Sequence, residues 1–187
     1  MMTQREALEV LAAVRGERVV VTTMSSVGIW PALSDGPKDF AYLPSSMGQG
    51  ISISLGLALA KPGLGVISVM GDGSLLMNLG SLVTVASHPA NLAIILLDNG
   101  LYEMTGGQPV ANAGHTDFAG LARAAGIPRV FAFEQLEEWK QNAGEIIAGP
   151  GPSFTWLKVE ARYGQKTPLP PRPMREQIAR LRRAIGA

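Results

Sequence analysis

Two polar clusters carry the side chains that could bind a metal ion and a phosphate. The first is Gly71-Asp72-Gly73-Ser74 and the second is Asp98-Asn99-Gly100, and each follows an apolar run, at residues 64–70 and 92–97. Open α/β sheets bind ligands where their strands end, so both clusters are expected at one edge of a sheet. Carboxylate and carboxamide oxygens are ligands that suit Mg²⁺, which usually bridges to a phosphate. The glycines would let backbone N–H groups approach that phosphate closely.

The residues around the two clusters extend this pattern. The segment Ser46-Met47-Gly48-Gln49-Gly50 lies upstream, LYEMTGGQ follows at residues 101–108, and Asn99 stands 27 positions after Asp72. With these flanks and this spacing, residues 19–159 resemble the thiamine diphosphate enzymes. They are most like the β chain of sulfopyruvate decarboxylase and the matching half of phosphonopyruvate decarboxylase. A lone Gly-Asp-Gly would be a weak signal, whereas the pair of motifs after two apolar runs is specific.

The resemblance implies a magnesium site. In the family, the positions that match Asp72 and Asn99 each give one side-chain oxygen, and the backbone carbonyl that matches Leu101 gives a third. Diphosphate oxygens and water would complete the octahedron. The family's second motif usually begins with Asn-Asn, whereas this chain has Asp98 before Asn99, and the ligand position is intact. From the residues alone, Asp72 could also be a helix cap and Asn99 a turn residue.

The resemblance also implies which residues bind thiamine diphosphate. Backbone N–H groups at the start of the helix after Asp72 favour a phosphate. Met47 matches a residue that lies under the cofactor and keeps its two rings folded together, and the alternative is a core methionine. Ser25 and Ser26 could contact the diphosphate or simply form a turn. The residues expected at the cofactor are Ser25, Ser26, Met47, Gly71, Asp72, Gly73, Ser74, Asn99, Leu101, Tyr102 and Thr105.

One catalytic group of the family is not found in this sequence. Thiamine enzymes need a glutamate on the aminopyrimidine ring, and a separate pyrimidine-binding domain carries it. Glu103 lacks that context, and neither Glu103 nor His115, in the glycine-rich loop 105–116, has an assigned role. We therefore expect a partner chain, an α subunit, that supplies the glutamate. The expected assembly is a hetero-oligomer that acts on a small anionic 2-oxoacid.

The composition is that of one globular domain. The chain has 187 residues, 47% hydrophobic and 17% charged, enough for a substantial core. A net charge of +1 argues against nucleic-acid binding. The absence of cysteine excludes disulfides and thiolate metal sites. The N-terminal residues are charged and no apolar run of about 20 residues occurs, so we expect a cytoplasmic protein without a membrane span.

The alternation of strand-like and helix-like segments predicts an α/β fold, with a doubly wound parallel sheet and helices on both faces. The domain expected at residues 1–165 is of the diphosphate-binding type. A segment with four prolines in residues 167–173 and a C-terminal helix follow at 166–187. Expected strands cover residues 19–23, 65–70, 92–97, 130–133 and 153–159. Expected helices cover residues 3–14, 48–60, 74–87, 117–126, 135–148 and 174–185.

The leading hypothesis is therefore the Mg²⁺- and thiamine diphosphate-binding subunit of a two-chain 2-oxoacid decarboxylase. Sulfopyruvate and phosphonopyruvate are the substrates that the resemblance implies. One alternative is a subunit of another thiamine enzyme, such as an acetolactate-synthase-like carboligase. Another is a non-catalytic phosphate- or nucleotide-binding module that uses the Gly71–Ser74 turn only as an anion site.

Overall fold

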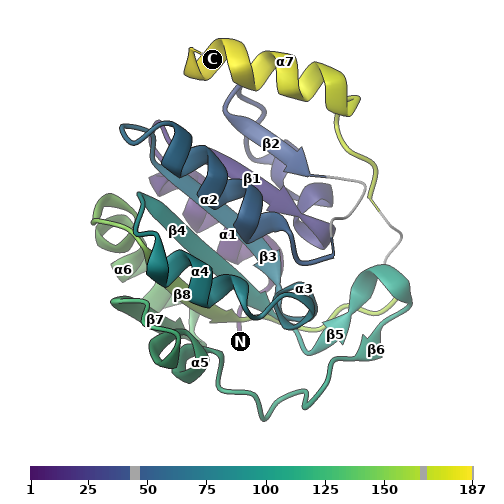
Figure 1. The fold of residues 1–187 in the computed structure, drawn as a ribbon. Coiled ribbons are helices and arrows are strands. Elements are labelled where there is room, and N and C mark those ends of the chain that lie inside the picture. The colour runs from purple at the N-terminus through teal and green to yellow at the C-terminus, as the bar shows by residue number, and fades with distance from the viewer. Residues whose placement is uncertain (43–46, 165–167, 187) are drawn as a thin grey trace.

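A six-stranded parallel sheet forms the centre of the molecule (Figure 1). The computed structural model describes residues 1–42, 47–164 and 168–186. The strand order is β2-β1-β3-β4-β8-β7, and every neighbouring pair is parallel, which confirms the predicted doubly wound sheet. The strands are β1 (Val19–Thr23), β2 (Asp39–Tyr42), β3 (Val66–Gly71), β4 (Leu92–Asp98), β7 (Arg129–Phe133) and β8 (Ser153–Lys158).

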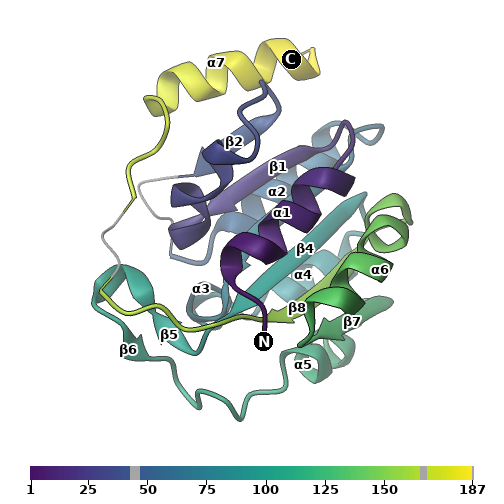
Figure 2. The ribbon, with the colours of Figure 1, turned by 180° about the vertical axis from the view of Figure 1, so that it is seen from behind.

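Helices cover both faces of this sheet, as the two opposite views show (Figures 1 and 2). The central strands are therefore mostly apolar, and successive residues join different cores. In β1, Val19 and Val21 belong to one core and Val20 to the other. The first core packs against α2 (Gly50–Ala60), α3 (Asp72–Met77), α4 (Ser81–Ser87) and α5 (Phe118–Ala124), and the second against α1 (Gln4–Val14) and α6 (Leu136–Ala148).

Local signals explain how the helices on the second face begin and pack. Thr3 caps α1 through a capping box with Glu6, in which each side chain bonds the other residue's backbone N–H. Trp139 of α6 is fully buried, and its Nε1–H donates to the carbonyl of Ala7 at 3.0 Å. This bond satisfies the polar atom of a large core side chain and joins the two helices.

Most predicted elements are confirmed to within two residues at each end, but the sequence missed β2. This strand begins at an aspartate, a residue that is disfavoured in strands. The Asp39 carboxylate is nevertheless satisfied by an ion pair with Arg15 and by N–H groups of Trp30 (2.9 Å) and Gly36 (2.7 Å). Tertiary contacts therefore outweigh local propensity at this position.

The single helix predicted for residues 74–87 is wrong. The chain forms α3, which already begins at Asp72, and a separate α4. Asn78 ends α3, where its backbone N–H donates to the Leu75 carbonyl at 3.0 Å and its side chain donates to the Gly48 carbonyl at 3.3 Å. The contact with Gly48 joins two segments 30 residues apart, so the sequence pattern could not show it.

The glycine-rich segment expected to be a loop is partly ordered. β5 (Leu101–Tyr102) pairs antiparallel with β6 (Gln108–Pro109), and a short 3₁₀-helix (η3, Glu103–Thr105) lies between them. Residues 110–117 then lead to α5 without a helix or strand. The hairpin keeps the residues that follow Asn99 close to the carboxyl edge of the sheet.

The C-terminal helix α7 (Met174–Ile185), confirmed at its predicted bounds, packs against the edge strand β2. Its Gln177 is buried, accepts from the Ala41 N–H at 2.8 Å and donates to the Arg172 carbonyl at 2.9 Å. An edge strand otherwise offers unpaired backbone groups for unwanted strand addition. α7 thus closes one edge of the sheet.

Two parts of the sequence prediction fall outside the described residues, namely Ser46 of the upstream motif and Thr167 of the proline-rich segment. Within the residues that the structure describes, none of the helices has the length and apolar character needed to cross a membrane. The division at residue 165 stays a prediction.

Gln177→Leu should lower the free energy of unfolding by about 1–3 kcal/mol. Leucine preserves the buried volume but leaves the Ala41 N–H without its acceptor, and an unsatisfied buried donor costs this amount. Urea unfolding followed by circular dichroism measures the change. The control is Arg175→Gln on the exposed side of α7, which should stay within about 0.5 kcal/mol of wild type. Equal stability of both variants would show that Gln177 contributes no net hydrogen bonding.

Candidate functional site: a cavity at the switch point of the sheet

A cavity of about 480 Å³ opens at the carboxyl ends of β1, β3 and β4. In the sheet, β1 and β3 are neighbours. The strand that follows β1 in the chain, β2, lies on the far side of β1, and the strand that follows β3, β4, lies on the far side of β3. Parallel sheets bind ligands at such a reversal of strand order, because the connections diverge there and leave a crevice. The volume is within the range of small-molecule sites.

The first polar cluster lies where β3 ends and α3 begins. Asp72 is buried, and its Oδ2 accepts from the backbone N–H of Gly100 at 3.0 Å. Gly73 faces the ring of Tyr102, and a Cβ at this position would lie 2.5 Å from two ring carbons. Glycine suits this position because the Tyr102 ring of β5 packs directly against the backbone of α3.

The second polar cluster forms the turn after β4. Asn99 Oδ1 accepts from the Leu101 N–H at 2.9 Å, which fixes the turn. Asp98 accepts from the Trp156 Nε1–H at 2.8 Å and from the Gly100 N–H at 3.2 Å. One backbone N–H group, that of Gly100, is thus shared by Asp72 and Asp98, and it ties the two clusters together.

Two carboxyl groups in such proximity disfavour the ionisation of both at once. Burial raises the pKa of Asp72 to about 7, and the charge of Asp98 together with a hydrogen bond between the two carboxyl groups adds to the rise. The N–H groups of Gly73 and Gly100 lower it, but by less. A divalent cation beside Asp72 would offset this repulsion, since bound cations are the largest local charges in such sites.

The end of β1 contributes a short 3₁₀-helix, η1 (Met24–Gly28), to the opposite wall. Ser25 lines the cavity, as expected. Ser26 does not: it is buried, its hydroxyl donates to the Thr23 carbonyl at 2.6 Å, and it accepts from the Thr23 N–H at 3.2 Å. These bonds make Ser26 a cap of η1.

Two methionines in the cavity wall have left-handed backbones. Met24 has φ of 55° and Met47 has φ of 44°. This conformation costs a non-glycine residue roughly 1–2 kcal/mol, and such strain clusters at ligand sites. Met47 is also 60% exposed, which argues against the alternative that it is an ordinary core residue.

The structure brings together every predicted cofactor residue except Ser26. Sequence reasoning missed several apolar wall residues. Met24 adjoins the predicted serines and Met104 adjoins Thr105, so proximity to the motifs could have found both. Pro168 to Pro170 follow the motifs by more than 60 residues and carry no local signal. The predicted residues in the wall are Ser25, Met47, Gly71, Asp72, Gly73, Ser74, Asn99, Leu101, Tyr102 and Thr105, and the missed ones are Met24, Met77, Leu97, Met104, Pro168, Leu169 and Pro170.

Glu103 also lines the cavity, whereas His115 lies in the exposed loop beyond β6. Glu103 is buried and its Oε1 accepts from the Gln4 Nε2–H at 2.9 Å. This bond links the first turn of α1 to the segment after Asn99, so Glu103 has a partner within the chain.

The chemistry of the wall fits a magnesium diphosphate with an attached ring system. Asp72 and Asn99 offer hard oxygens at one end, and methionine, leucine and proline side chains form most of the remaining wall. Among the described residues there is no cluster of three or more His, Cys, Asp or Glu that could hold a metal unaided. The ion would therefore take part of its coordination from the ligand, as Mg²⁺ usually does.

Comparison with known proteins agrees with this chemistry. Residues 34–155 match the model of the thiamine pyrophosphate enzyme C-terminal TPP-binding domain. The chain belongs to the thiamine pyrophosphate enzyme family. The predicted resemblance is therefore confirmed, and with it thiamine diphosphate and Mg²⁺ as the cofactors of the family.

Two named relatives of this thiamine pyrophosphate domain differ in length. The sulfopyruvate decarboxylase subunit beta of Methanothermobacter thermautotrophicus is 37% identical over 164 residues, which cover 86% of this chain and 84% of that one. The phosphonopyruvate decarboxylase of Streptomyces viridochromogenes is 38% identical over 160 residues, which cover 84% of this chain and 40% of that one. The chain thus spans about two fifths of the second relative.

A solved structure shares the fold. It is a candidate thiamin diphosphate-dependent enzyme from Mycobacterium smegmatis, with a TM-score of 0.69 and 21% sequence identity. The alignment covers 84% of this chain and 32% of that one. At this identity the likeness concerns the fold, and it confirms the predicted α/β architecture.

Asp72→Asn should stabilise the metal-free chain at high pH. The raised pKa means that folded Asp72 binds its proton more tightly than the unfolded chain, where the ordinary value is 3.8. This contribution to stability is fully present below about pH 4 and is lost as the pH rises through about 7. Asparagine stays neutral, so the variant should gain up to about 4 kcal/mol at pH 8 and almost nothing at pH 4.

Urea unfolding in a chelating buffer at both pH values measures this difference. Glu138→Gln, on the exposed surface of α6, is the control and should change the stability at neither pH. A variant that is less stable than wild type at pH 8 would contradict the account in which burial of Asp72 and the nearby Asp98 carboxylate disfavour the charged form of Asp72.

Proposed function

We propose that the chain is the Mg²⁺- and thiamine diphosphate-binding subunit of a two-chain 2-oxoacid decarboxylase. The observation that carries the proposal is the pairing of buried Asp72 with the Asn99 turn, through Gly100, in the wall of the cavity. The mutual coverage with a sulfopyruvate decarboxylase β subunit supports a separate subunit. Sulfopyruvate and phosphonopyruvate, named in the two relatives, are the proposed substrates. A cytoplasmic location stays a prediction.

Each part of the cavity has a role in this proposal. The side-chain oxygens of Asp72 and Asn99 and the carbonyl of Leu101 would hold the Mg²⁺ ion, and backbone N–H groups at Gly73 and Ser74 would bind the diphosphate. Met47 would contact the rings. When bound, thiamine diphosphate supplies the electron sink for the loss of CO₂, and the protein orients it and excludes water.

The activating glutamate is expected on a partner chain. Among the described residues that line the cavity, Glu103 is the only glutamate, and its carboxylate is already bonded to Gln4. This bond supports a role for Glu103 in placing the segment after Asn99. We therefore propose that an α subunit with a pyrimidine-binding domain completes the site.

The face formed by α2, α3 and α4 suits such a partner. Residues 47–87 contain only two charged residues, Lys61 and Asp72, and the second is buried. The centres of protein interfaces are depleted of charge in the same way. Large apolar side chains exposed on this face are Met47, Leu59, Met77 and Val83.

Asp72→Ala and Asn99→Ala should each abolish Mg²⁺-dependent binding of thiamine diphosphate, because each removes a proposed metal ligand. Calorimetry of the full chain with and without Mg²⁺ measures the binding, and circular dichroism shows whether the fold persists. Asp117→Ala, which removes a carboxylate at the start of α5 away from the cavity, is the control for lost charge. Wild-type affinity in both ligand variants would exclude this metal site and favour a simple anion-binding module.

Met47→Ala should leave the affinity for thiamine diphosphate within about tenfold, roughly 1.4 kcal/mol, but should slow turnover much more. The side chain is proposed to keep the two rings folded together rather than to anchor the charged diphosphate. Hydrogen–deuterium exchange at C2 of the bound cofactor, in the complex with the partner, should also slow. Unchanged exchange together with a lower melting temperature would make Met47 an ordinary packing residue.

The purified chain should not decarboxylate sulfopyruvate or phosphonopyruvate until the pyrimidine-domain partner is added. The reason is the missing glutamate, without which the aminopyrimidine is not activated. An assay of CO₂ release, with sizing of the complex, tests both the activity and the assembly. Turnover by the single chain, with mass spectrometry excluding a co-purified partner, would overturn the two-chain proposal. Carboligation in place of aldehyde release would favour the acetolactate-synthase-like alternative.

A further inference from the structure

The segment Pro168-Leu169-Pro170 lies outside residues 34–155, which match the family model, yet it lines the same cavity as Asp72 and Asn99. It precedes α7 by three residues. Leu169 is 85% exposed, although the cavity wall that it helps to form also contains Met24 and Met104. An exposed leucine beside an apolar hollow suggests that its side chain acquires a partner when the hollow is filled.

One end of this segment is placed by close packing on η1. A Cβ at Gly28 would lie 3.0 Å from Cβ of Pro168, so glycine lets the proline ring approach the backbone. η1 also carries Met24 and Ser25, which line the cavity. Proline fixes the local backbone, so Leu169 is presented with little loss of conformational entropy.

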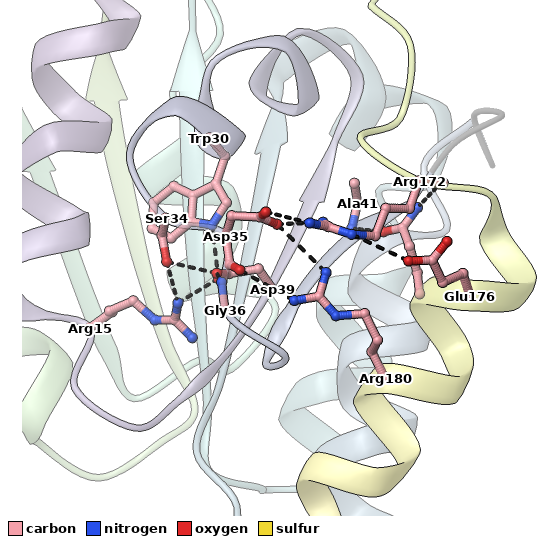
Figure 3. A network of polar contacts seen from close by, with 11 residues as sticks. Arg15, Trp30, Ser34, Asp35, Gly36, Asp39, Ala41, Arg172, Glu176 and Arg180 are labelled. Atoms are coloured by element: carbon pink, nitrogen blue, oxygen red, sulfur yellow. Dashed lines mark hydrogen bonds and ion pairs between the residues drawn. The ribbon is translucent and has the colours of Figure 1, made fainter.

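The other end is anchored to the sheet through α7 (Figure 3). Both terminal nitrogens of Arg172 donate to the Asp35 carboxylate, and Arg180 lies 3.8 Å from the same group. The hydrogen bond from Arg172 lowers the pKa of Asp35, so the pair persists at neutral pH. Gln177 then joins α7 to Ala41 in β2.

Asp35 is itself held in place by the loop before β2. The adjoining residues Ser34 and Gly36 both donate to Asp39 Oδ2, at 2.6 Å and 2.7 Å. The Asp39 carboxylate also pairs with Arg15 from the end of α1. The anchor of α7 therefore rests on the sheet edge rather than on a free surface loop.

We infer that Pro168-Leu169-Pro170 is a wall of the thiamine diphosphate site, in which Leu169 covers the ring portion of the cofactor, and that the contacts of Asp35 with Arg172 and Arg180 position this wall. The inference rests on the proposed function. An apolar side chain suits the rings and not the diphosphate, which Asp72 and Asn99 engage through Mg²⁺. Exclusion of water from the rings is the contribution that such a wall makes.

Calorimetry of the full chain with thiamine diphosphate and Mg²⁺ tests this inference in two matched pairs of variants. Leu169→Ala removes the side chain over the cavity, and its control, Leu59→Ala, removes a half-exposed leucine from α2, away from the cavity. Asp35→Asn weakens the anchor of α7, and its control, Glu176→Gln, removes the other carboxylate beside Arg172, at 3.4 Å. The melting temperature of every metal-free variant is measured alongside.

Leu169→Ala and Asp35→Asn should each weaken the binding at least fivefold, whereas the two controls should bind as wild type does. Wild-type affinity in Leu169→Ala would overturn the inference. The proposed function would still stand in that case, provided that Asp72→Ala loses its binding. If Glu176→Gln weakens the binding as much as Asp35→Asn does, the contact between Asp35 and Arg172 does not position the wall. If wild type binds no cofactor even with the α subunit present, the proposed function fails first and the inference with it.

Discussion

The burial of the Asp72 carboxylate at the end of β3 is the constraint on which the site depends. A buried carboxylate must be compensated, and here the compensation comes from the backbone N–H groups of Gly73 and Gly100, the second of which Asp72 shares with Asp98. That shared donor fixes the position of the turn at Asn99, which in turn sets the start of the β5–β6 hairpin. Burial and the neighbouring Asp98 carboxylate disfavour the charged form of Asp72 in the metal-free protein, so a cation at this point would be favoured by the protein's own electrostatics.

The sequence predicted the structure correctly wherever the residues of a single segment determine its conformation. The buried strands, the helices with clear ends and the two polar clusters were all predictable, because each depends on apolar periodicity or on a short motif. β2 was not, since the Asp39 carboxylate is compensated by Arg15 and Trp30 from other elements. The break between α3 and α4 was hidden for the same reason: Asn78 is drawn to Gly48, which lies across the fold.

The residues of the site likewise fall into those that a local motif predicts and those that only the fold brings in. Asp72, Asn99 and the glycines follow strand ends and were found from spacing, whereas Leu169 reaches the cavity from a distant part of the chain. Ser26 is a different case: its hydroxyl bonds the Thr23 carbonyl and it does not line the cavity, so its role at the cofactor stays a prediction. Sequence patterns locate groups at the ends of their own strands, but they do not reveal which remote segments complete the enclosure or which hydroxyls are already bonded.

The nearly uncharged face of residues 47–87 has a kinetic consequence. Charged interfaces attract their partners over a distance and associate quickly at low ionic strength. A face with Lys61 and buried Asp72 as its only charges contributes almost no such steering. Its docking with another chain would proceed at the slower rate set by orientation alone and would respond little to salt. The affinity of such a complex would then depend on a slow dissociation rate rather than on a fast association rate.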